Sequence, residues 1–488
     1  PPRSTLFPYT TLFRSAIGEN TVGDNNVGIG YRSLRANVSG SNGVAIGTES
    51  QLYANDTSTP WTNYNTSIGH QALRGSTTAA NNTGNYNTSI GYQSLYLNTT
   101  GAYNSAQGVN ALYLNTTGGY NSSQGSYALY SNTTGNSNSA QGYKALYSNT
   151  TGSSNTAQGY NSLYSSITGS NGVAIGYESQ RYTNDTATPW TNYNTSIGYQ
   201  ALRGSTTAAD NTGNLNTAIG YQSLYLNTTG SNNSSQGYQA LSANTTGNSN
   251  SAQGYASLNK NTTGSGNSAQ GVNALYSNTT GGYNSAQGIN ALYYNTTGSN
   301  NTAQGTNALN SNTTGSNGVA IGTESQRYAN STATPWTNYS TSIGYQALRG
   351  STTPANNTGN SNTAIGYQSL LNNTSGNYNT ALGGGSLYDN TSGNSNVGIG
   401  INSLNNNTTG NYNFALGTNS LLNLSSGNDN IAIGTEAGRY YNNGSGSLTT
   451  ASNLILLGSS SSPLANSDIN EIVIGYNAIG NGSNSVVL

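Results

Sequence analysis

A 17-residue repeat constrains the fold of this chain more than any other feature of its sequence. The segment 104–118 returns as 121–135 and again as 138–152. Each copy holds a short alternating run, a glycine, a second short run ending in Leu-Tyr, and an Asn-Thr-Thr-Gly turn. The middle glycines of these copies are Gly108, Gly125 and Gly142. A fixed short period is typical of stacked architectures, in which each repeat contacts its neighbours.

The equivalent glycine can be followed from Gly18 to Gly475, and most of the intervals between copies equal one period. The interval widens, twice in succession, near 47–91, 176–220 and 322–366. These positions predict one continuous array of coils over residues 16–434, with wider coils inserted at three places.

A longer repeat lies on top of the short one. The heptapeptide Ser-Asn-Gly-Val-Ala-Ile-Gly begins at Ser41, Ser170 and Ser316. The second of these intervals exceeds the first by one period of the short repeat, so one whole repeat has been gained without loss of register. A single coil is therefore the expected structural unit.

Composition excludes several classes of protein. Charged residues make up 5% of the 488 residues, Gly accounts for 64, and Cys is missing, so disulfides and thiolate metal sites are excluded. A net charge of −1 gives no basic surface for nucleic acid. No apolar run is long enough to predict a membrane-spanning helix. Since no initiator Met or signal peptide is found, we expect a fragment or a processed product.

Each coil is expected to contain two short strands. The run before the glycine alternates with period 2, and the run after it is rich in Tyr and Leu, whereas no helical apolar stripe is found. Glycine permits the bend between the two runs, and Asn-Thr-Thr-Gly supplies the return turn. The sequence therefore predicts an all-β fold, a parallel β-solenoid of roughly 25 coils.

The expected core is thin. Leucine recurs four positions after the glycine, and glutamine or isoleucine occupies the position just before it. Buried glutamines could bond to their copies above and below as an amide ladder. The leucines are Leu112, Leu129 and Leu146, and the glutamines are Gln107, Gln124 and Gln141. Because one leucine per coil buries little surface, we expect protomers to associate side by side.

Two terminal segments depart from the pattern. Residues 1–15 contain no repeat and look like translated sequencing adapter, so a non-native leader is predicted; a genuine N-terminal cap is the alternative. Residues 435–488 are expected to be terminal coils that lead to a missing C-terminal region.

Several motifs carry a resemblance. Val44-Ala45-Ile46-Gly47 and its copies at 173–176 and 319–322 resemble the YadA-like head repeats of trimeric autotransporter adhesins. The longer unit, with Asn-Thr-Ala-Ile-Gly and Asn-Thr-Thr-Gly, is similar to repeats of phage tail fibres. The tail from 453 to 488 resembles the part of such fibres that precedes a self-cleaving chaperone. The resemblance implies a left-handed, trimeric β-roll, although the coil here is longer than the adhesin unit.

Ionisable residues give little indication of catalysis. The single histidine, His70, stands where sister coils carry Tyr199 and Tyr345, so it is interpreted as a variant of a repeat position. Glu49, Glu178 and Glu324 recur near Arg74, Arg203 and Arg349 of the next coil, which favours ion pairs between coils over paired acid catalysis. The sequence predicts no catalytic residue, no metal site and no cofactor, and hence a protein that is not an enzyme.

The wide coils hold the candidate binding residues. All three tryptophans lie in their loops, each followed by a tyrosine. Exposed loop aromatics are suited to glycan stacking or receptor contact. In the alternative, the indole folds back over the wider coil or packs between protomers. The residues are Trp61, Tyr64, Trp190, Tyr193, Trp336 and Tyr339.

The Asn-Thr-Thr triplets are also N-glycosylation sequons, for example at Asn98, Asn115 and Asn132. They are interpreted as turn-forming ladders in a bacterial or phage product, and as glycan acceptors in a eukaryotic secreted one.

The leading hypothesis is a non-enzymatic fibrous adhesin or phage tail-fibre shaft that binds cell-surface glycans or receptors through many weak contacts. Such a protein would be extracellular, on a cell surface or a virion. The alternatives are an ice-binding solenoid with stacked threonines and a purely structural self-assembling fibre. A polysaccharide depolymerase is disfavoured because no acid cluster is found.

Overall fold

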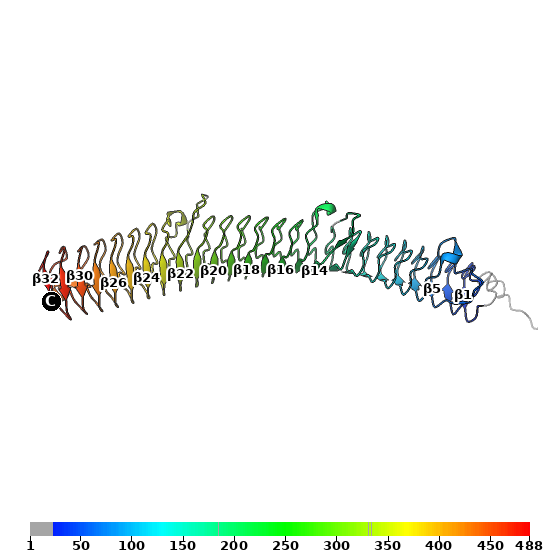
Figure 1. Ribbon diagram of the computed structural model, residues 1–488, viewed down its shortest axis with the longest axis horizontal. Helices are drawn as coiled ribbons and strands as arrows, with labels where there is room; N and C mark the ends of the chain where they lie inside the picture. Colours follow the sequence, from blue (N-terminus) through cyan, green and yellow to red (C-terminus); the bar gives the residue numbers. More distant parts are fainter. Residues whose placement is uncertain (1–22, 184, 330, 333) are drawn as a thin grey trace, which may run out of the picture. The chain divides into compact units, whose positions relative to one another are not determined.

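The computed structural model describes residues 23–183, 185–329, 331–332 and 334–488. The expected leader 1–15 and Gly18 lie outside these residues. The chain divides into two compact units, residues 1–246 and 247–488. Within each unit, short strands of successive coils are stacked in a row (Figure 1). The prediction of an all-β, parallel solenoid is confirmed.

Twenty-six short strands make up these rows. In the first unit they are β1 (Val27–Ile29), β3 (Val44–Ile46), β5 (Thr66–Ile68), β6 (Thr88–Ile90), β7 (Ser105–Gln107), β8 (Ser122–Gln124), β9 (Ser139–Gln141), β10 (Thr156–Gln158), β12 (Val173–Ile175), β14 (Thr195–Ile197), β15 (Thr217–Ile219) and β16 (Ser234–Gln236). In the second unit they are β17 (Ser251–Gln253), β18 (Ser268–Gln270), β19 (Ser285–Gln287), β20 (Thr302–Gln304), β21 (Val319–Ile321), β22 (Thr341–Ile343), β23 (Thr363–Ile365), β24 (Thr380–Leu382), β25 (Val397–Ile399), β26 (Phe414–Leu416), β27 (Ile431–Ile433), β30 (Ile455–Leu457), β31 (Ile472–Ile474) and β32 (Val486–Val487).

The remaining elements are short additions to this pattern. Parallel pairs join β2 (Gly40–Ser41) to β4 (Trp61–Thr62) and β11 (Gly169–Ser170) to β13 (Trp190–Thr191). An antiparallel pair joins β28 (Tyr440–Tyr441) to β29 (Gly446–Ser447). The described helices are single 3-10 turns: η1 (Ala79–Asn81), η2 (Ala208–Asp210), η3 (Pro354–Asn356) and η4 (Asn442–Gly444).

The period of the repeat sets the register of the stack. Ser105 pairs with Ser122, which pairs with Ser139, and the next two positions of each strand follow in step. Successive landmark glycines approach closely. Gly108 has a φ of +137°, and a Cβ built on it would lie 2.7 Å from the carbonyl carbon and oxygen of Gly125. Only glycine combines this backbone conformation with such a close approach, so the corner of each coil requires it.

The prediction of a second strand after the glycine is wrong. This run is a series of turns, with Asn110 and Leu112 in the left-handed region at φ values of 54° and 52°. Their backbone N–H groups still bond to neighbouring coils, at 2.9 Å to Tyr92 O and 3.0 Å to Ala128 O. The alternation turns the adjacent side chains of Ala111 and Leu112 inward, and both are fully buried. An extended strand would send them to opposite faces.

The core combines the expected leucines with unexpected asparagines. Leu112, Leu129 and Leu146 are fully buried. Beside them, buried asparagine amides bond from coil to coil. Asn132 Nδ2 donates to Asn115 Oδ1 at 2.7 Å, and Asn149 Nδ2 donates to Asn132 Oδ1 at 2.8 Å. Since these amides are buried and hydrogen-bonded, the sequons they belong to are closed to glycosylation in the folded chain.

The glutamines before the glycine lie outside the core. Gln107, Gln124 and Gln141 are exposed, because the middle residue of each strand points inward and its two neighbours point outward. The amide ladder nevertheless forms on this outer face of the sheet. Gln141 Nε2 donates to Gln124 Oε1 at 2.9 Å, and Gln158 repeats the bond to Gln141.

Candidate functional site

The tryptophan loop of each wide coil returns to the solenoid through a short strand. Trp61 pairs in register with Gly40, and Trp190 pairs with Gly169. In the third block a bridge between Ser316 and Thr337 gives the same arrangement. The three loops therefore rejoin the solenoid at equivalent points, and each indole is placed over a glycine of the preceding coil.

The indoles fold back over the wide coils. A Cβ built on Gly40 would lie 2.8 Å from Trp61 Nε1, and one on Gly315 would lie 2.8 Å from Trp336 Nε1. A side chain at either glycine would displace the ring. Each indole Nε1 is buried without a hydrogen-bond partner. The geometry matches the structural alternative for these tryptophans, and the glycines that make room for them were not singled out from the sequence.

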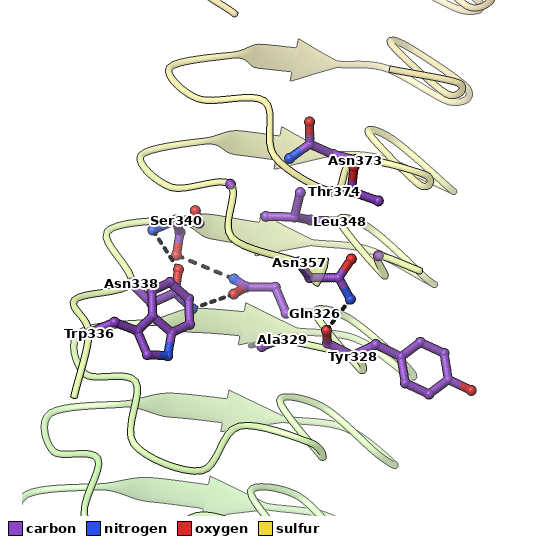
Figure 2. A pocket seen from close by; sticks show the side chains of 12 residues that line it. Gln326, Tyr328, Ala329, Trp336, Asn338, Ser340, Leu348, Asn357, Asn373 and Thr374 are labelled. Atoms are coloured by element: carbon purple, nitrogen blue, oxygen red, sulfur yellow. Dashed lines mark hydrogen bonds between the residues drawn. The ribbon is translucent and has the colours of Figure 1, made fainter. Parts of the chain in front are cut away.

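A small cavity beside each tryptophan measures about 20 Å³. This is room for roughly one water molecule, so a sugar ring cannot enter. A polar network closes the coil next to it. In the third block, Gln326 Oε1 accepts from Asn338 Nδ2 at 2.7 Å, and Gln326 Nε2 donates to Val319 O at 2.8 Å. Figure 2 shows Gln326 pointing toward Asn338 and Ser340 beside Trp336.

The tyrosines of the same loops are presented to solvent. Tyr64, Tyr193 and Tyr339 are 48%, 57% and 64% exposed. Their backbone N–H groups donate to Asn85, Asn214 and Asn360 Oδ1 at 2.6, 2.7 and 2.7 Å, which fixes the backbone beneath the ring. Of the six candidate binding residues, these three are exposed, whereas the three tryptophans are half-buried.

Tyr64 continues into a row of stacked rings. Its ring centroid lies 4.9 Å from that of Tyr86, and Tyr103 and Tyr120 follow at the same spacing. The positions above Tyr193 and Tyr339 hold Leu215 and Ser361, so those two tyrosines lack a ring at the next coil. The first copy therefore presents an aromatic row where the other two present single rings.

A longer aromatic row follows the landmark glycines in the first unit. It runs through Tyr143, Tyr160, Tyr177, Tyr199, Tyr221 and Tyr238, with centroid separations of 5.0 to 5.3 Å. His70 occupies the same position and stacks on Tyr92 at 5.3 Å, which confirms that it is a variant of a repeat position. The recurrence of tyrosine directly after the glycine could have revealed this row in the sequence.

A second row lies four positions further along each coil. Tyr96, Tyr113, Tyr130, Tyr147 and Tyr164 stack at 4.9 to 5.2 Å. Burial, followed by the neighbouring tyrosines, raises the pKa of Tyr113 and of Tyr147 above the ordinary value of 10.0. These hydroxyls therefore remain protonated at pH values where free tyrosine ionises.

The recurrent glutamates form the expected ion pairs between coils. Arg203 Nε lies 3.3 Å from Glu178 Oε2, and Arg349 Nε lies 3.4 Å from Glu324 Oε2. The corresponding pair in the first block, Arg74 with Glu49, is longer at 3.9 Å. Gln200 and Gln346 donate to the same Oε2 atoms of Glu178 and Glu324 at 2.9 and 2.8 Å. Each of these carboxylates therefore links its own coil to the next one.

The described ranges also bear on metal binding and on membrane insertion. They contain no cluster of three or more side chains suited to hold a metal ion. None of their helices has the length and hydropathy that a membrane span needs.

No protein-family model matches the sequence, and no curated protein matches it.

Proposed function

We propose that this protein is a non-enzymatic fibrous adhesin or phage tail-fibre shaft, extracellular on a cell surface or a virion. In this proposal the solenoid presents repeated loops that bind cell-surface glycans or receptors. The observation that carries it is the recurrence of an exposed loop tyrosine at three equivalent points, Tyr64, Tyr193 and Tyr339. Many weak contacts of one kind give strong attachment through a high effective concentration.

The contacts of the recurrent charged and amide side chains support a structural role. The recurrent glutamates are paired with arginines, and the buried amides bond to their copies in neighbouring coils. The resemblance to YadA-like head repeats supports the same role and a homotrimer. An exposed apolar sheet face at the C-terminal coils gives such a trimer a surface on which to form.

The test uses the whole chain and a change at all three tyrosines together. Adsorption to capsular polysaccharide and lipopolysaccharide from candidate hosts is measured for the wild type and for Tyr64→Ser/Tyr193→Ser/Tyr339→Ser. The matched control, Tyr283→Ser/Tyr378→Ser/Tyr412→Ser, removes three exposed tyrosines outside the wide coils.

The proposal predicts a loss of more than tenfold in apparent affinity for the first variant alone, because several weak contacts disappear at once. Equal losses for both variants would point to nonspecific adsorption and contradict it. Absence of binding to any host surface would leave the purely structural fibre.

An ice-binding role has one observation in its favour. Thr117, Thr134 and Thr151 recur as exposed residues in successive turns. The neighbouring threonines contribute little, because Thr116 Oγ1 already donates to Thr133 O at 3.1 Å and Thr133 Oγ1 to Thr150 O at 3.1 Å. A single row of free hydroxyls results, and thermal hysteresis at micromolar protein would be required to prefer this function.

A further inference from the structure

One row of side chains in the second unit is interrupted by glycine. The residue after the landmark glycine is Tyr345, then Tyr367, then Gly384, then Ile401 in consecutive coils. The coils themselves continue without a break: Gly385 N–H donates to Tyr367 O, and Asn402 N–H donates to Gly384 O, both at 2.9 Å. The strands on either side, β23, β24 and β25, also stay in register. A side chain is therefore missing from an otherwise regular stack.

The gap leaves one face of an aromatic ring uncovered. Tyr367 stacks on Tyr345 at 5.5 Å on one side only. It is 60% exposed, whereas Tyr199, which has rings on both faces, is 41% exposed. A groove of about 530 Å³ opens at this point, lined by Tyr367, Gly384, Tyr388 and Ile401 among others. Its volume falls in the range of small-molecule sites, unlike the cavities beside the tryptophans.

The height of the groove selects the kind of ring that fits. Tyr367 and Ile401 are two coils apart, which corresponds to about 9.6 Å. A flat aromatic ring in contact with carbon atoms above and below needs only about 7–8 Å. The remaining height suits a puckered, saturated ring, which is thicker than a planar one.

The rim of the groove supplies hydrogen-bond acceptors. Gln368 Nε2 donates to Gln346 Oε1 at 2.8 Å, and the row of amides stops there because the next coil has Gly385. Elsewhere the next glutamine donates to this oxygen, as Gln239 does to Gln222. The Asp389 carboxylate is fixed at the rim by Asn372 Nδ2, which donates to its Oδ1 at 2.8 Å.

We propose that this groove, which we name the Tyr367 slot (Tyr367, Gln368, Gly384, Asp389 and Ile401), binds one pyranose ring of a carbohydrate. The apolar face of the sugar stacks on Tyr367, Ile401 covers the other face, and the hydroxyls donate to Gln368 Oε1 and Asp389. This inference rests on the proposed function and gives it a second, single-ring site outside the tryptophan loops.

Two substitutions test the slot in the full chain. Tyr367→Ala removes the stacking surface. Gly384→Tyr fills the groove with the ring that other coils carry, and a Cβ there would meet no neighbour closer than Tyr367 O at 3.9 Å, so the fold tolerates it. Tyr378→Ala is the control, since it removes an exposed tyrosine from another row.

Saturation-transfer NMR titrations use methyl pyranosides of glucose, galactose, mannose and N-acetylglucosamine, with phenol as a planar probe. We expect at least one pyranoside to bind the wild type and Tyr378→Ala equally. Tyr367→Ala should weaken that binding about tenfold. Gly384→Tyr should abolish it. Pyranoside binding that is unaffected by Gly384→Tyr, or binding of phenol alone, would overturn the proposal.

The same variants separate this inference from the proposed function. Adsorption to host polysaccharide that survives Gly384→Tyr and is lost in the loop-tyrosine variant, with no pyranoside bound to the slot, overturns the slot and keeps the adhesin. Pyranoside binding that is weakened in both slot variants, with no adsorption to any host surface, supports the slot and contradicts the proposed adhesin function.

Discussion

Asparagine holds successive coils together from inside the core. A column of apolar side chains would contribute only non-directional burial. Each asparagine amide instead forms directional hydrogen bonds to the coil above and to the coil below. The rows end where the next coil departs from the pattern. Asn149 Oδ1 is left without a partner because the following coil has Ser166 in that position. Asn312 and Asn407 Oδ1 are likewise unpaired, because the following coils have Ala329 and Leu424 in that position.

The buried amides should therefore be sensitive to single changes. Asn132→Ala removes a donor from Asn115 Oδ1 and from Gly135 O, and an acceptor from Asn149. Since buried polar groups are left unpaired, we expect the free energy of unfolding to fall by about 1–3 kcal/mol. Urea denaturation followed by circular dichroism measures it. Ser139→Ala, on the exposed side of β9, should change it by less than about 0.5 kcal/mol. Equal effects would mean that the amide row is dispensable.

Tyrosine ionisation should limit stability at high pH. The folded chain holds the pKa of Tyr113 and Tyr147 above 10.0. Above pH 10 the unfolded chain releases these protons while the folded chain retains them, so stability decreases as pH rises from that point. Melting temperatures from pH 8 to 11 should fall at the alkaline end, and absorbance at 295 nm should show a late-titrating group of tyrosines.

Phenylalanine variants provide the control for this pH effect. Tyr113→Phe/Tyr147→Phe keeps the stacked rings and removes the two hydroxyls, so its alkaline decrease should be shallower than that of the wild type. An identical pH profile for both proteins would assign the alkaline decrease to other groups.

At the scale of the coil, the sequence predicts the period and the corner but not the path between them. Gly108 and Leu112 could be identified because their spacing repeats without change. The turns after the glycine could not, because a leucine in the left-handed region looks like a strand residue in any pattern of hydrophobicity. The sequence places Asn132 in a turn, whereas its burial depends on the coils before and after it, which each supply one bonding partner.

The candidate site, too, is only partly predictable from the sequence. Loop aromatics in the wide coils could be found by composition, and the ion pairs between coils by their recurrence. The sequence does not show which of these aromatic residues faces solvent, because the position of Trp61 depends on its packing against Gly40 in the preceding coil. The Tyr367 slot can be recognised only once residues one period apart are known to lie in one row of side chains.

Removal of one whole coil should leave the fold intact. Deletion of residues 122–138 joins Asn121 to Ser139, so β7 would pair directly with β9 in the register that β8 now occupies. Because the energy of a solenoid is nearly a sum over neighbouring coils, we expect a native-like circular dichroism spectrum and a cooperative melt. Deletion of residues 122–130 removes half a coil and should abolish both. Similar behaviour of the two deletions would show that the coil is not the structural unit.

At the scale of the whole molecule, the proposed homotrimer needs a surface for contact between protomers, and the outer face of the sheet in the second unit is the candidate. In β17 to β20 this face carries serine or threonine with glutamine. In β25, β26, β27, β30 and β31 both outward residues are apolar, and Leu416, Ile431, Ile433 and Ile474 are each 38% exposed. A contiguous apolar patch on an exposed face is typical of interaction surfaces, and in the proposed trimer it is the face between protomers.

Charges on this apolar face should therefore separate the protomers. Ile431→Lys/Ile433→Lys alters two outward positions of β27 and leaves the buried Ala432 in place, so each coil keeps its core. Sedimentation equilibrium at micromolar protein should give a trimeric mass for the wild type and a monomeric mass for this variant. Ser268→Lys/Gln270→Lys makes the same change at the polar positions of β18 and should remain trimeric. A wild-type monomer, or a variant that keeps the wild-type mass, would remove the apolar face as the site of assembly.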